Sequence, residues 1–119
     1  MGNKKAGTAY VSLDGEQLAL KGGWECNFDP YETEALTGQS GVVGYKEMHN
    51  VPFIAGDAYL DDEITPEDLA AVRDATVQIE LADGKVGVLQ NAWKAGTITV
   101  NSEEGTMAVR FEGLAGEWL

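Results

Sequence analysis

The apolar residues of this chain alternate with polar ones over several short runs, a pattern typical of β-strands with one buried face. Glycine is frequent and proline is scarce, with 15 and 3 residues, which favours strands joined by tight turns. When residues are paired outward from each turn, three hairpins emerge. The sequence therefore predicts a domain that is mainly β.

The first predicted hairpin, TAYVSLDGEQLALK, turns at Asp14-Gly15, because both central positions of a two-residue hairpin turn need positive φ. The face predicted to be buried holds the facing pairs Leu13–Glu16, Val11–Leu18 and Ala9–Leu20. The second, TVQIELADGKVGVLQ, turns at Asp83-Gly84. Its predicted pairs are Leu81–Val86 and Ile79–Val88. The third turns at Ser102–Gly105, with the predicted pairs Val100–Met107 and Ile98–Val109.

One helix is predicted at 65–74. Thr65 is placed to cap it, Pro66 is suited to its first position, and Arg73 falls in its last turn. Aromatic and β-branched residues between Lys21 and Leu60 indicate further short strands, whereas 29–41 is polar and contains glycine, and we expect a long loop there. No internal repeat or linker is visible, so we expect one domain over 1–119.

The chain carries 20 acidic and 8 basic residues, for a net charge of −12. Nucleic-acid binding by charge needs the opposite sign, because neutralised phosphates supply most of that affinity. No apolar run approaches the roughly 20 residues that span a bilayer, so we expect no membrane association. We expect the protein to be made in a cytoplasm. Cys26 is the single cysteine, which fits a reducing compartment and excludes an internal disulfide.

The sequence offers no catalytic group of residues, no cofactor site and no metal site. His49 is the single histidine, so we expect it on a surface rather than in a catalytic dyad with Cys26. The acidic group Asp57, Asp61, Asp62 and Glu63 lacks the ligand spacing of a calcium loop. The glycine-rich segments do not match a phosphate-binding loop, and the tryptophans lack the surrounding cations of a base-stacking platform. Binding or assembly is therefore a better hypothesis for the function than catalysis.

Four collinear segments resemble the tail tube protein of Mu-like contractile-tailed bacteriophages. They are KKAGTAYVSLDGEQLALKGGW, GQSGVVGYKEMHNVPFIAGD, DATVQIELADGKVGVLQNAWKAG and GTMAVRFEGLAGEWL. The resemblance implies an antiparallel β-sandwich or partial barrel with one short flanking α-helix. It also implies a structural virion protein that forms stacked rings, usually hexameric, around a channel for DNA ejection.

Further partners follow from the same resemblance: other copies of the chain, a tail sheath, a tape-measure protein, and baseplate and tail terminator proteins. DNA is expected to pass without specific binding, and the protein to be assembled in the bacterial host cytoplasm into the virion tail. The residues expected at subunit or ring contacts are Tyr31, Leu36, Gln39, Tyr45, His49 and Trp118. The residues expected to face the channel are Glu16, Gln17, Gln78 and Glu80.

Three other functions remain open at this stage. The same architecture serves in the tubes of contractile bacteriocins and secretion machines. A carrier of small apolar ligands would also use short alternating strands, although few long strands are predicted here to enclose a cavity. An enzyme is the third alternative.

Overall fold

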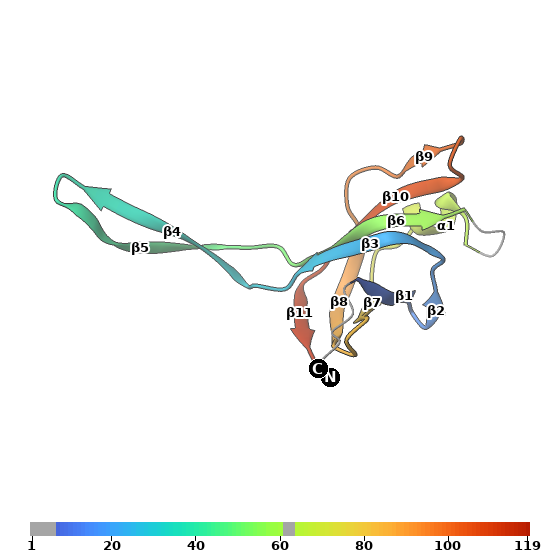
Figure 1. The fold of residues 1–119 in the computed structure, drawn as a ribbon, viewed down its shortest axis with the longest axis horizontal. Helices are drawn as coiled ribbons and strands as arrows, with labels where there is room; N and C mark the ends of the chain where they lie inside the picture. The colour runs from blue at the N-terminus through green and yellow to red at the C-terminus, as the bar shows by residue number, and fades with distance from the viewer. Residues whose placement is uncertain (1–6, 61–63) are drawn as a thin grey trace.

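The computed structural model describes residues 7–60 and 64–119, and it is mainly β with antiparallel pairing throughout (Figure 1). The strands are β1 (Thr8–Leu13), β2 (Glu16–Gln17), β3 (Leu20–Asn27), β4 (Tyr31–Gly38), β5 (Gly41–His49), β6 (Phe53–Tyr59), β7 (Ala75–Leu81), β8 (Val86–Lys94), β9 (Thr99–Asn101), β10 (Thr106–Glu112) and β11 (Ala115–Trp118). The helix α1 spans Pro66–Ala70.

Nine strands form one continuous sheet in the order β2-β1-β7-β8-β10-β6-β3, with β11 beside β8 and β9 beside β10. One half of this sheet runs from β2 to β8 and the other from β10 to β3. Side chains from both halves join α1 in a single core, which confirms the mainly β fold with one short helix. The largest fully buried side chains are Phe111, Ile54, Leu69, Ile79, Leu89, Met107, Val11 and Val77. We call this part the body.

The turn of the first hairpin is confirmed, but the hairpin is shorter than predicted. Asp14 and Gly15 both have positive φ, 49° and 90°, and Leu13 pairs with Glu16. β2 ends at Gln17, and the chain then crosses to the other half of the sheet, where β3 forms its ladder with β6. The predicted pairing of Leu20 with Ala9 is therefore wrong, because Leu20 pairs with Ala58.

The second hairpin has a register one residue away from the prediction. The amide of Leu81 donates to the carbonyl of Lys85 (2.8 Å), so three residues, 82–84, form the loop, and Gly84 takes a φ of 97°. Such a loop adds one residue to the turn. Ile79 consequently pairs with Gly87 instead of Val88, and Gly87 and Leu89 face the core in place of Val86 and Val88.

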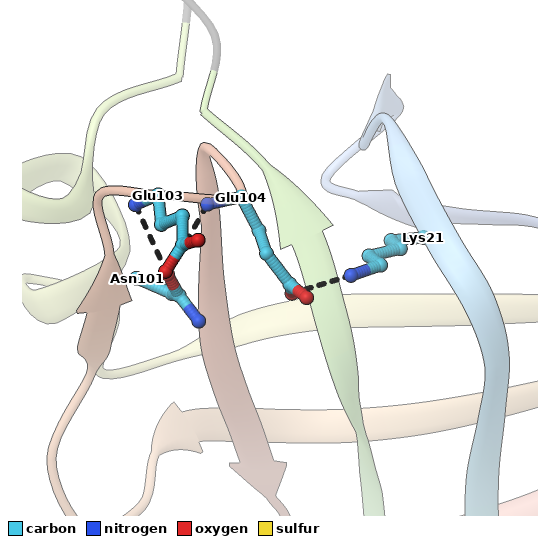
Figure 2. A network of polar contacts seen from close by, with 4 residues as sticks. All are labelled: Lys21, Asn101, Glu103 and Glu104. Atoms are coloured by element: carbon cyan, nitrogen blue, oxygen red, sulfur yellow. Dashed lines mark hydrogen bonds and ion pairs between the residues drawn. The ribbon is translucent and has the colours of Figure 1, made fainter.

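The third hairpin is confirmed around its turn, where Val100 pairs with Met107. The side-chain carboxamide oxygen of Asn101 accepts from the amides of Glu103 and Glu104, and Glu104 forms an ion pair with Lys21 on β3 (Figure 2). The ladder stops at Thr99. Ile98, which was predicted to pair with Val109, packs against the core from outside the strand.

The helix begins as predicted and ends earlier. The hydroxyl of Thr65 accepts from the amide of Asp68, and the carboxylate of Asp68 accepts from the amide of Thr65, each at 3.2 Å. This reciprocal cap satisfies amides that lack partners inside the helix. α1 nevertheless ends at Ala70, so Arg73 lies beyond its last turn, and the guanidinium donates to the carbonyls of Ala70 and Val72.

The expected loop at 29–41 is wrong, because most of it is strand. β4 and β5 pair with each other as a separate two-stranded sheet, from Tyr31 opposite His49 to Gly38 opposite Gly41. This hairpin projects far from the body (Figure 1), and the molecule measures 59 × 41 × 29 Å. We call residues 31–49 the arm. Neither face of the arm is covered, so its strands lack the alternation that marks a half-buried strand.

The ring of Phe28 lies where the chain leaves the body for the arm, and it is held between two strands. A Cβ at Gly87 on β8 would lie 2.3 Å from this ring, and one at Gly116 on β11 would lie 2.5 Å from it. The ring of Trp118 packs beside Phe28, with centroids 5.0 Å apart. Glycine at both positions therefore allows the close approach that seats Phe28.

We predict that Gly87→Ala lowers the free energy of unfolding by about 1–3 kcal/mol, because the added methyl group overpacks the site of Phe28. Chemical denaturation measures this change. Gly23→Ala is the matched control, since nothing lies within 4 Å of its Cβ position, and its effect should stay within about 0.5 kcal/mol. Equal effects of the two substitutions would contradict the packing of Phe28.

We also predict that the body folds without most of the arm. Thr33 faces Glu47, so an Asn-Gly turn can replace residues 34–46. The free energy of unfolding should change by no more than about 1 kcal/mol, because loop length contributes weakly to stability. None of the arm residues 31–49 belongs to the buried core. Denaturation followed by tryptophan fluorescence tests this, and loss of the cooperative transition would contradict it.

Candidate assembly surface

The arm has two different faces, because residues that pair across an antiparallel ribbon point to the same side. One face, which we call the apolar face, carries Ala35 opposite Tyr45 and Thr37 opposite Val42. Tyr45 and Val42 are 66% and 73% exposed. An open groove of about 690 Å³ runs beside them, lined by Thr33, Glu34, Ala35, Val42, Gly44, Tyr45 and Glu47.

The opposite face of the arm is more strongly charged. Glu34 and Lys46 pair across the strands with 3.6 Å between carboxylate and ammonium, and Glu32 lies opposite Met48. Both charged partners are more than half exposed, so this ion pair contributes little to stability. Large apolar side chains gather mainly on the first face, which makes that face the better candidate for a protein contact.

A bulge interrupts the arm near its tip. The register shifts between Leu36 and Thr37, so Val43 has no partner across the ribbon. Val43 is 69% exposed and lies beside Val42. Sequence reasoning did not select these two valines as contact residues, although adjacent valines between glycines in a polar segment were a usable signal.

The root of the arm has its own polar and aromatic contacts. The rings of Tyr31 and His49 stack with centroids 5.4 Å apart. A cavity of about 250 Å³ opens beside them, and its lining includes Phe28, Pro52 and Leu114 from the body. His49 therefore forms part of a junction between arm and body.

The structure brings five of the six predicted contact residues together on the arm. Tyr31, Tyr45 and His49 share the apolar face, Leu36 lies on the opposite face, and Gln39 lies in the turn at the tip. Trp118 is separate, since it packs beside Phe28 on the body. The arm and the C-terminal strand are thus two different surfaces.

Three of the four predicted channel residues also share one face. Ser12 pairs with both Gln17 and Gln78, and Tyr10 pairs with Glu80, so these side chains lie on the side of β1 and β7 away from the core. Glu16 does not belong with them. It pairs with Leu13, which also pairs with the buried Val77, and this places Glu16 on the core side at an exposed edge.

Electrostatic effects in the described residues are local. The Tyr10 hydroxyl donates to a Glu80 carboxylate oxygen at 3.1 Å, and this hydrogen bond to an anion raises the pKa of Tyr10. Burial raises the pKa of the Cys26 thiol, which disfavours the reactive thiolate. Of the acidic group weighed as a calcium site, residues 61–63 lie outside the described part, and residues 7–60 and 64–119 contain no metal-binding cluster.

Among residues 7–60 and 64–119, no helix has the length and apolar character needed to cross a membrane.

A search of curated proteins found no match to this chain. The family model described as phage tail tube protein matches residues 2–118, nearly the full length. That family is structural rather than enzymatic, and its members form a tube in the virion tail together with other tail proteins. The chain belongs to the phage tail tube protein family.

Proposed function

We propose that copies of this chain assemble into hexameric rings, which stack into the inner tube of a contractile tail of the Mu type and form the conduit for DNA ejection. The observation that carries this proposal is the arm, whose apolar face holds Tyr45 and Val42 in exposed positions. Contiguous exposed apolar side chains of this kind mark protein contact sites.

The size of the arm supports a contact with another copy. The radius of gyration is 16.9 Å, against about 13–14 Å for a compact domain of this length. A contact between unlike surfaces of identical chains closes into a ring by rotation or extends without limit along an axis. An arm that reaches beyond its own body supplies one of the two unlike surfaces, and a neighbouring body supplies the other.

The net charge supports passage of DNA without capture. Six chains at −12 would give a ring a charge of 6 × −12 = −72. A channel surface with few cations does not retain phosphates, although screening limits the repulsion to a range of about 8 Å at physiological salt. We propose that the face with Gln17, Gln78 and Glu80 lines this acidic channel.

The remaining partners belong to the same proposal. A sheath outside the tube, a tape-measure protein within it, and baseplate and terminator proteins at its ends would contact the rings. Assembly in the bacterial host cytoplasm then places the protein in the virion tail. These partners rest on the resemblance to tail tube proteins of Mu-like phages.

We predict that Val42→Ser combined with Tyr45→Ser raises the protein concentration needed for assembly by at least about tenfold, because each buried apolar side chain contributes about 1.5–3 kcal/mol. Electron microscopy of a concentration series measures the onset of rings or tubes. Val100→Ser combined with Tyr59→Ser is the matched control, since both residues are exposed on the body.

The control pair should assemble at nearly the wild-type concentration. If the arm variant assembles as readily as wild type, the apolar face is not the contact. If the wild-type protein forms no ring or tube at any concentration, even with tail initiator proteins present, the proposed function itself is contradicted.

We further predict that Glu80→Lys leaves tubes intact but slows DNA ejection, because a cation in the channel attracts phosphates. The rate of ejection in an infection assay measures the effect. Glu80→Gln removes the charge without adding a cation and should have a smaller effect. Glu16→Lys is the matched control on the other face of the sheet, and equal slowing by Glu16→Lys would contradict the assignment of the channel face.

A further inference from the structure

Asn50 joins the two chain segments that connect the arm to the body. Its amide donates to the carbonyl of Pro30 at 3.0 Å. Its side-chain Nδ2 donates to Oδ1 of Asn27 at 3.1 Å and to the carbonyl of Asp29 at 2.8 Å. Asn27–Pro30 leads into the arm and Asn50 leads out of it, so these three hydrogen bonds cross the base of the ribbon.

The segment that Asn50 contacts is itself anchored to the body. Asn27 ends β3 and pairs with Phe53 of β6, and Phe28 is seated against Gly87 and Gly116. Oδ1 of Asn27 also accepts from the amide of Asp29 at 3.0 Å, which fixes the turn before Pro30. The acceptors of Asn50 are therefore held in place by core packing rather than by the arm.

The rest of the arm has no comparable support. Every residue of β4 is exposed, and in β5 all but Gly44 are exposed. A two-stranded ribbon without a packed face is marginally stable and has no intrinsic direction relative to the domain that carries it. The direction of the arm must then be set at its root.

We propose that Asn50 is a positioning residue that fixes the direction of the arm relative to the body through its two side-chain hydrogen bonds. In a tail tube, this would present the apolar face to a neighbouring copy at a constant angle and reduce the conformational entropy lost on docking. That consequence rests on the proposed function, whereas the fixed direction does not.

The test measures the direction of the arm within one chain. Spin labels at Ser40→Cys, in the arm turn, and Glu67→Cys, on α1, report the distance between arm and body in a Cys26→Ala background. Pulsed electron resonance is recorded at a dilution where light scattering gives the mass of one chain. Asn50→Ala should make the distance distribution about twice as wide, because its width reports the range of arm directions present in the frozen sample.

Two further variants make the result specific. Asn50→Asp keeps the size of the side chain and loses both donors, so it should widen the distribution as Asn50→Ala does. Asn101→Ala removes an asparagine that also makes two hydrogen bonds to nearby groups (Figure 2). Asn101 ends β9 in the body, so this substitution should leave the width unchanged. Backbone circular dichroism checks that each variant is folded.

An unchanged width in both Asn50 variants would overturn the inference, and so would equal widening by Asn101→Ala. Either result concerns single chains, so it leaves the proposed assembly intact. Failure of the wild-type protein to assemble, with the width still dependent on Asn50, would contradict the proposed function and leave the positioning role of Asn50 standing.

Discussion

A two-stranded ribbon cannot bury its own side chains, because a core needs a second layer to cover one of its faces. The arm of this protein extends away from the body, whose inward-facing residues form the core of the body itself. Tyr45 and Val42 consequently remain in water for as long as the chain is alone. The body has its own core, whereas we propose that another copy of the chain covers the apolar face of the arm. This division separates the buried core residues from the candidate contact residues, which lie in different parts of one short chain.

The charge of the chain sets the conditions for that contact. Chains at −12 repel one another at long range, and salt reduces this repulsion within a Debye length of about 8–10 Å. Burial of apolar side chains acts only at contact, and unlike the repulsion it does not depend on the net charge of the chains. The cations of the described residues are mostly engaged locally, as in the pairs Lys21–Glu104, Lys46–Glu34 and Arg110–Glu112. If copies associate through the arm as proposed, shape and apolar area there must outweigh this repulsion, which opposes contacts that bury little surface.

The sequence predicted those features whose physical cause is local. The Asp14-Gly15 turn, the Thr65 cap and the Val100–Met107 pair depend on neighbouring residues, and all three are present. The register of the second hairpin was wrong because a three-residue loop, with Gly84 at positive φ, and a two-residue turn share the same Asp-Gly sequence. The first strand of the arm, β4, was mistaken for a loop because it is stabilised by pairing alone and carries no buried alternation. The grouping of Gln17 with Gln78 and Glu80 could be predicted only in part, since the partner of β1 lies more than 60 residues away along the chain.

An exposed ribbon with two free edges would normally invite indiscriminate strand pairing between chains. The arm carries two features that oppose this outcome. Charged side chains recur along it, with Glu32 and Glu34 on β4 and Lys46 and Glu47 on β5, and they disfavour flat association of identical edges. The bulge at Val43 interrupts the ladder near the tip and increases the local twist, so a second ribbon cannot continue the same hydrogen-bond register past it. Edge pairing is thus limited while the apolar face stays available, and contact through side chains is favoured over contact through the backbone. This selectivity suits a protein that must add copies in one geometry.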